Sequence, residues 1–369
     1  QRLDPDDPTL GVLEVTLLIA EGRSEEAKAR AAFWKARLER QGVEDLEELM
    51  VFLSKVAEEP LEAFTEIVPS WDLGGQLLRL LEDTAGLPPG ERVVRAGDEE
   101  GYLQPVESLR EALEAWRERF SPEFDTDGVE AEEEWLTLLR EEPRLLTTFD
   151  VLDDLGLSLQ SMVSSEEEFL DLQRRLGERA VGFLESLLTV AEKEGVARLD
   201  WSWIENRAAL RLVARHATLL TDDAPEKAVK LMAWLLRLSP DDNLGTRIPL
   251  IHLYCGLGRL DAAKSLAEQH PDDFPSMMYG EILTYYLAGE RGRALSMLSD
   301  LYREYPRILD TLVAENPREP AQWSPYGATV GGDDEAWLYR REFLRHWRDT
   351  GALDWARAAH LSLPKPGRR

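Results

Sequence analysis

Three stretches of the chain share one pattern: APEKAVKLMAWLLRLSP at residues 224–240, GLGRLDAAKSLAEQHP at 256–271 and RGRALSMLSDLYREYP at 291–306. Aligned on their small residues, Ala228, Ala263 and Ala294 stand 35 and 31 residues apart. A glycine precedes Ala263 and Ala294 by five residues, and a proline follows Ala228 and Ala294 by twelve. We interpret each stretch as the second helix of a helical hairpin. The alanine lets the first helix approach, the glycine permits a left-handed turn, and the proline ends the helix.

The segments before these stretches have the periodicity of first helices. Apolar residues fall on one stripe in each of two segments, namely Leu250, Ile251, Leu253, Tyr254 and Leu257 in one and Ile282, Tyr285, Tyr286 and Leu287 in the other. The region resembles tetratricopeptide repeats, whose period is about 34 residues, although the usual tryptophan near the start of each first helix is missing. A fourth unit is indicated near the N-terminus, where Gly22 precedes Ala27 by five residues and Ser24 is typical of a helix start.

The composition favours an all-α fold, because Leu, Ala, Glu and Arg dominate while Val, Ile and Thr are sparse. We expect tetratricopeptide-like helical hairpins forming an α-solenoid, with a less regular helical middle. Further helices are predicted at 43–58, 71–85, 105–120, 132–142, 165–195, 201–220, 333–349 and 351–361. The segment 316–330 is rich in proline and glycine and is predicted to be a loop. Strand signals are limited to 92–95, which is too short to build a sheet.

Three regions are expected along the chain: 1–90, helical with one repeat-like hairpin; 91–222, irregular and helical; and 223–369, the repeats with a C-terminal helical cap. Part of the last region has a second resemblance. Its motifs are PDDNLGTR at 240–247, NP at 316–317, GxxEA at 332–336, Trp347, and GALxW at 351–355. Their order is similar to the C-terminal helical region of the suppressor-of-tumorigenicity-seven family and its bacterial relatives. That resemblance implies a helical interaction module and no activity. Some of those bacterial relatives carry a cysteine-rich metal motif, which this chain lacks.

The chain is strongly acidic, with 71 acidic and 43 basic residues and a formal net charge of −28. Such a charge repels phosphate backbones and anionic lipid, and we find no local basic patch in the sequence. We therefore expect neither nucleic acid nor a membrane as partner. The single Cys255 excludes an internal disulfide. No signal peptide is visible, so a cytoplasmic location is expected.

Few residues indicate chemistry. The five histidines have no metal-ligand spacing, and Cys255 lies on the apolar side of a predicted helix, where a packing role is expected. The segment 123–134 places Asp125, Asp127 and Glu134 at positions three, five and twelve of an EF-hand loop. Glutamates at positions one and eight depart from that motif, so an acidic turn before a helix is the competing interpretation. No cofactor is predicted.

The leading hypothesis is a protein–protein interaction scaffold that binds a peptide or partner protein on its helical-repeat surface. The net charge predicts a partner with basic character, and the sequence leaves the oligomeric state open. Arg247, His252 and Tyr285 are the candidate partner-binding residues, because each lies on a predicted first helix. The alternative is an enzyme with a carboxylate-based site in the irregular middle region. Raised pKa values of carboxyl groups there would support this alternative.

Overall fold

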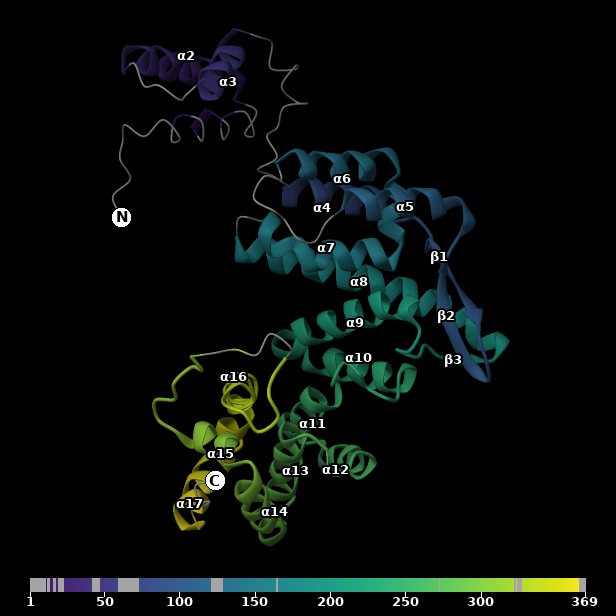
Figure 1. Cartoon of the computed structure of the whole chain (residues 1–369), viewed down its shortest axis with the longest axis vertical. Coiled ribbons are helices and arrows are strands. Elements are labelled where there is room, and N and C mark those ends of the chain that lie inside the picture. The colour runs from purple at the N-terminus through teal and green to yellow at the C-terminus, as the bar shows by residue number, and fades with distance from the viewer. Residues whose placement is uncertain are drawn as a thin grey trace. The chain divides into compact units, whose positions relative to one another are not determined.

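The computed structural model describes residues 11, 14, 15, 18, 23–41, 47–58, 73–120, 129–163, 165–271, 273–321, 323 and 327–364. Helices make up most of this part of the chain, which confirms the predicted all-α class (Figure 1). The chain divides into two compact units, Gln1–Arg79 with Glu123–Thr137 and Leu80–Pro122 with Leu138–Arg369. The three regions expected from the sequence stay a prediction. None of the described helices has the length and apolarity needed to cross a bilayer.

The first unit contains α2 (Ser24–Gln41), α3 (Glu47–Glu58), the start of α4 (Leu73–Asp83) and most of α6 (Val129–Glu141). Helix α2 begins at Ser24, as predicted from the sequence. Helices α2 and α3 pack on each other, and their core is formed by Val15, Ala31, Trp34, Leu38, Leu53 and Val56. The indole N–H of Trp34 donates to the carboxylate of Glu14 at 3.0 Å. The polar group of the largest side chain in this small core is therefore hydrogen-bonded.

The second unit contains a three-stranded sheet that was not predicted from the sequence. Strand β1 (Glu91–Arg95) pairs antiparallel with β2 (Glu99–Pro105), which pairs in parallel with β3 (Val196–Arg198). The prediction that no sheet could form was therefore wrong. The reason is non-local, because β2 gains its second partner from a segment about a hundred residues further along the chain.

The side chain of Asn206 explains why β2 is stable beside so short a strand as β3. Asn206 is fully buried, accepts from the N–H of Leu103 at 3.0 Å, and donates to the carbonyls of Gly101 and Asp200 at 3.1 and 2.9 Å. It thus takes the place of ladder partners that β3 is too short to supply. One amide side chain joins β2 to the loop after β3.

Next come α5 (Arg110–Arg119), α6 (Val129–Glu141), α7 (Phe149–Met162), α8 (Glu166–Ala191) and α9 (Ile204–Asp223), with short 3-10 turns at Glu107–Leu109, Pro143–Thr147 and Glu192–Glu194. Helix α8 starts as its sequence predicts, since the Ser165 hydroxyl accepts from the N–H of Glu168 at 3.2 Å and three glutamates follow. Helix α7 was not predicted.

Five consecutive helices follow: α10 (Pro225–Leu238), α11 (Arg247–Gly256), α12 (Leu260–Gln269), α13 (Pro275–Leu287) and α14 (Arg291–Glu304). Within them, α11 packs on α12, α13 packs on α14, and α11 packs on α13 (Figure 1). The alanines that align the sequence stretches, Ala228, Ala263 and Ala294, are fully buried. Close helix packing at these positions is what the sequence pattern predicted. That they form a tetratricopeptide array stays a prediction.

The turns after α11 and α13 have the same hydrogen bonds. Gly258 and Gly289 have φ values of 69° and 81°, in the left-handed region where a side chain would be strained. One residue later, the N–H of Arg259 donates to the carbonyl of Tyr254 at 2.8 Å, and the N–H of Glu290 donates to the carbonyl of Tyr285 at 2.9 Å. Both turns therefore end their helix with a Schellman motif.

The chain closes with α15 (Pro306–Val313), α16 (Asp333–Asp349) and α17 (Ala352–Ser362). Pro306, interpreted from the sequence as a helix stop, is the first residue of α15, a position where its missing N–H costs nothing. The described residues between α15 and α16 form no helix, as expected for the loop at 316–330. Helices α10 to α17 share one hydrophobic core.

Candidate functional site

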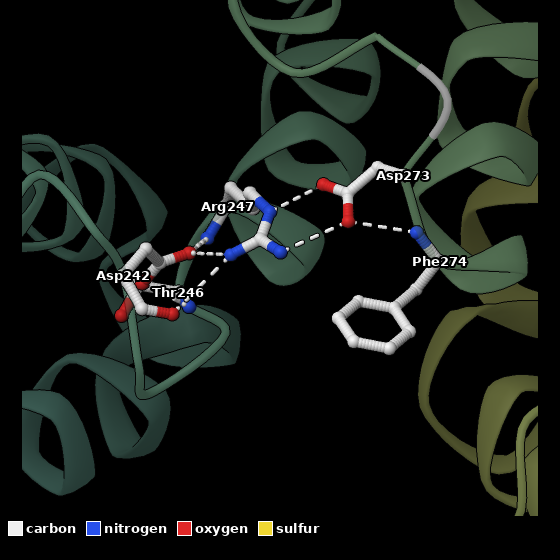
Figure 2. A network of polar contacts seen from close by, with 5 residues as sticks. All are labelled: Asp242, Thr246, Arg247, Asp273 and Phe274. Carbon is white, nitrogen blue, oxygen red and sulfur yellow. Dashed lines mark hydrogen bonds and ion pairs between the residues drawn. The ribbon is translucent and has the colours of Figure 1, made fainter.

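The first candidate partner-binding residue, Arg247, is held inside the fold at the start of α11 (Figure 2). Its Nη1 lies 2.8 Å from Asp242 Oδ2 and its Nη2 lies 2.9 Å from Asp273 Oδ1, while its Nε also donates to Asp273. The guanidinium carbon lies 5.9 Å from the centre of the Phe274 ring. With 11% of its side chain exposed, Arg247 connects the turn before α11 to the start of α13.

The two carboxylates of this network also cap helices. Asp242, with a left-handed φ of 47°, accepts from the N–H groups of Thr246 and Arg247 at 2.8 and 2.9 Å. Asp273 accepts from the N–H of Phe274 at 2.7 Å. Burial acts to raise the pKa of Asp273, but the hydrogen bonds from Arg247 and Phe274 and the nearby positive charge of Arg247 together outweigh it and hold this pKa below its ordinary value. Asp273 is therefore ionised at neutral pH, and the network has a clear structural role.

The second candidate, His252, is fully buried in α11. Its Nδ1 lies 2.8 Å from the carbonyl of Ile248 and its Nε2 lies 2.9 Å from the hydroxyl of Tyr339, which also accepts from the indole N–H of Trp347 at 2.8 Å. Burial lowers the pKa of His252 to about 3, so its ring is neutral at physiological pH. These bonds fit a tautomer in which Nδ1 donates to Ile248 and Nε2 accepts from Tyr339.

The third candidate, Tyr285, is 2% exposed on α13. The guanidinium carbon of Arg293 lies 3.8 Å from its ring centre, and Lys264 Nζ lies 5.8 Å from it. All three candidate side chains therefore contact other residues of the same chain. That they contact a partner stays a prediction, and the burial of His252 and Tyr285 argues against a direct contact.

Cys255 is also a packing residue in this structure. It is buried, and its Sγ lies 3.2 Å from the hydroxyl of Thr284. Burial raises the pKa of the thiol to about 11, so almost no reactive thiolate exists at neutral pH. This is the role that its position in the sequence indicated.

The candidate calcium loop lies partly outside the described residues. Asp125 and Asp127 lie outside the described residues, and only the backbone of Glu134, in α6, is described. Within the part of the chain that the structure does describe, no three His, Cys, Asp or Glu side chains come together as metal ligands would.

One concave surface formed by described residues is a groove of about 700 Å³ between α8, α10 and the end of α11. We call it the α8–α10 groove; it is lined by Glu185, Leu188, Thr189, Glu192, Val229, Lys230, Leu231, Ala233, Trp234, Arg237, Tyr254 and Arg259. Trp234 and Tyr254 are half-buried and so present aromatic surface to it. Pockets of this size and mixed lining are suited to a peptide side chain or a small ligand.

Charges of both signs line the α8–α10 groove on different elements. Glu185 and Glu192 come from α8 and the turn after it, whereas Lys230 and Arg237 come from α10. Burial raises the pKa of Tyr254, which is therefore a neutral phenol at physiological pH. A ligand in the groove would meet carboxylates from α8 and the turn after it, and cations from α10, the helix that also carries Trp234.

Among the described residues between 91 and 222, two carboxyl groups have raised pKa values. Burial raises the pKa of Glu91 to about 8, although its carboxyl accepts from the N–H of Phe149 at 2.8 Å. Burial also raises the pKa of Asp154 to about 6, and its carboxyl accepts from the indole N–H of Trp116 at 2.9 Å. Each carboxyl joins two elements of the fold, and this structural role is sufficient to explain its burial.

The groove residues were only partly visible in the sequence. Tyr254 belongs to an apolar stripe of a predicted first helix, whereas the sequence does not distinguish Trp234 from the other tryptophans. Glu185 and Lys230 carried no signal, because they come from helices about forty residues apart and look like ordinary solvent-facing charges.

Comparison with known proteins gives no match, either among protein-family models, among curated proteins or among solved structures. The two resemblances described from the sequence stay expectations.

Proposed function

We propose that this chain is a protein-binding scaffold that holds a peptide or partner protein in the α8–α10 groove. The observation that carries the proposal is the groove itself, about 700 Å³ in volume, with half-buried Trp234 and Tyr254 at its surface. Aromatic side chains in a concave site, ringed by charge, are typical of the anchor points of protein interfaces. The neutral, buried states of His252 and Cys255 also suit a binding role better than a catalytic one.

The partner is proposed to have basic character. The formal net charge of −28 favours the encounter with a cationic protein, and the effect weakens as salt screens it. Within the groove, Glu185 and Glu192 would accept the partner's Lys or Arg side chains, while its apolar side chains would pack on Trp234. We place this interaction in the cytoplasm, without nucleic acid or membrane as partner.

The test is affinity capture with the tagged full chain from a native lysate of its source, at about 50 mM and about 500 mM salt. The wild-type chain is expected to retain one basic protein in stoichiometric amount at low salt and to release it at high salt. The variant Glu185→Lys with Glu192→Lys, which reverses both carboxylates of the groove, is expected to lose this protein.

A matched control makes the same change in charge on the same helix but outside the groove. Glu166→Lys with Glu167→Lys alters exposed residues in the first turn of α8 and is expected to retain the partner. Capture of the same proteins by all three baits, or of none by the wild-type chain, would contradict the proposal.

The raised pKa values of Glu91 and Asp154 favour one alternative, an enzyme with a carboxylate-based site. Incubating the chain with a metabolite extract would test it by mass spectrometry. A compound consumed by the wild-type chain and by the groove variant, but not by Asp154→Asn, would support the enzyme. A profile unchanged by the wild-type chain would count against it.

A further inference from the structure

Helix α16 has two chemically different faces. Its inner face is formed by Ala336, Tyr339, Phe343, His346 and Trp347, which are buried where α16 packs on α11, α13, α15 and α17. Burial lowers the pKa of His346 to about 4, so its ring is uncharged at neutral pH. The two buried acids of the helix, Asp334 and Glu335, lie in its first turn, whereas its most exposed arginines, Arg341 and Arg348, lie on the other face.

Four residues of the outer face form what we call the arginine stripe: Trp337, Arg341, Leu344 and Arg348. Their separations of four, three and four residues, at about 100° per residue, keep them within about 60° of one another around the helix axis. The stripe lines a surface hollow of about 290 Å³, to which Arg340 and Arg345 also contribute. The helical period thus gathers cations that look scattered in the sequence.

The two flanking arginines are engaged in the fold. Arg340 donates to the carbonyls of Thr311 and Leu312 at 2.8 and 2.6 Å, and it therefore satisfies the C-terminal end of α15. Arg345 forms an ion pair with Asp222 at the end of α9. Both side chains position α16 against its neighbours.

The two arginines of the stripe itself are held far more weakly. Arg341 lies 3.7 Å from Glu342, and Arg348 lies 3.0 Å from Asp349, which in each case is the next residue in the chain. Their side chains are 61% and 65% exposed. Exposed ion pairs of this kind contribute little free energy, so both guanidinium groups can exchange these contacts for a stronger carboxylate acceptor.

We propose that the arginine stripe is a docking surface for an acidic, amphipathic helix of a partner protein. Charge complementarity selects the carboxylates, which would pair with Arg341 and Arg348. The half-buried Trp337 and Leu344 alternate with the arginines, so the partner helix must also present apolar residues at a spacing of three and four. From Trp337 to Arg348 the stripe is about 16 Å long, which matches about three turns of helix.

An acidic helix fits this surface better than a nucleic acid. A phosphate backbone would leave Trp337 and Leu344 without apolar partners unless bases stacked on the indole. The formal net charge of −28 would also repel a long polyanion from the rest of the chain. A short peptide places its few carboxylates on the stripe alone. This site has the opposite charge preference to the partner proposed for the α8–α10 groove, and it does not depend on that proposal.

The test uses fluorescence anisotropy with the full chain and a labelled peptide of about 18 residues. The peptide has Leu at successive intervals of three and four and Glu at the positions beside them. The wild-type chain is expected to bind it, with an affinity that falls as salt is raised. Arg341→Glu with Arg348→Glu is expected to weaken binding by at least about tenfold. Trp337→Ala is expected to weaken it while leaving its salt dependence unchanged.

Matched controls separate the stripe from general charge effects. Arg110→Glu with Arg303→Glu makes the same change in charge at exposed arginines on other helices and is expected to bind as the wild type does. The groove variant Glu185→Lys with Glu192→Lys is also expected to retain the peptide. Circular dichroism checks that each variant is folded.

Several outcomes would overturn the assignment. One is equal binding of a single-stranded oligonucleotide, or of an all-Glu peptide without leucine, because the apolar residues would then have no role. Another is equal loss of binding in the Arg110 and Arg303 control. Failure of the wild-type chain to bind the peptide, or a dimer of the chain that the Arg341 and Arg348 variant abolishes, would also contradict it.

Discussion

The carboxyl group of Glu91 caps a helix that begins 58 residues further along the chain. Because burial raises its pKa from 4.5 to about 8, the folded state binds the proton more tightly than the unfolded state does. The protonated carboxyl group therefore contributes fully to stability when the pH is below its pKa in the unfolded state. This contribution is lost as the pH rises through about 8, its pKa in the folded state.

Glu91→Gln tests this directly, because its amide oxygen can still accept from the N–H of Phe149 without ionising. From about pH 5 to about pH 8, the free energy of unfolding of the wild type should decline relative to this variant by an amount on the order of a few kcal/mol. Urea unfolding across this range measures the difference. Glu107→Gln, at an exposed glutamate, serves as control, and parallel pH profiles for wild type and Glu91→Gln would refute the role.

Arg247 gives a second prediction at the scale of the residue. Arg247→Ala leaves Asp242 and Asp273, which have 2% and 10% of their side chains exposed, without their shared cation. We expect a loss of about 3 kcal/mol in the free energy of unfolding. The exposed pair of Arg303 and Asp300 provides the comparison, since Arg303→Ala should cost less than about 1 kcal/mol. Equal effects of the two substitutions in urea unfolding would show that the network contributes no more than a surface pair.

At the scale of elements, the sheet depends on Asn206. Asn206→Ala leaves the N–H of Leu103 and two carbonyls buried without this partner, which we expect to cost roughly 2 kcal/mol or more. Hydrogen exchange followed by mass spectrometry should show the peptide containing Leu103 exchanging faster in the variant. Asn243→Ala, at an exposed asparagine, is the control. Unchanged exchange at Leu103 would mean that other contacts hold β2 in place.

The elements that could be predicted from the sequence are those with local signals. The start of α8 is specified by Ser165 and the glutamates after it, and α16 occupies the segment 333–349 that its periodicity indicated. Helix α7 was missed because Asp153 interrupts its apolar pattern, and the arginines that neutralise this buried carboxylate, Arg211 and Arg215, lie on α9. Strand β3 was missed because its partner, β2, lies about a hundred residues earlier in the chain.

The same limit applies to the site residues. The sequence placed Arg247 and His252 on a helix correctly, but it could not show that Asp273 and Tyr339 would enclose them from 26 and 87 residues away. Burial at those positions is a property of tertiary packing. The arginine stripe, by contrast, follows from the spacing of residues within α16. It can be identified once the structure shows which face of the helix is buried.

At the scale of the whole molecule, the two compact units have cores of very different size. The cluster around α2 and α3 in the first unit comprises six buried residues, whereas α10 to α17 of the second unit share a far larger core. We expect calorimetry to resolve two unfolding transitions, with the first unit melting at the lower temperature. Leu53→Ala should lower the temperature of the lower transition only, and Leu283→Ala that of the upper transition only. Each substitution leaves a cavity and is expected to cost about 2–5 kcal/mol in the free energy of unfolding of its own unit. A single transition shifted by both substitutions would show that the units unfold together.

The pairing of β2 with β3 also has a consequence for biosynthesis. The N–H of Leu103 meets its acceptor on Asn206, 103 residues later in the chain. Until β3 and Asn206 have been translated, the β1–β2 hairpin is the part of this sheet that can form, and an isolated hairpin is at best marginally stable in water. Release of residue 206 from the exit tunnel is thus the earliest moment at which this part of the molecule can become resistant to cellular proteases.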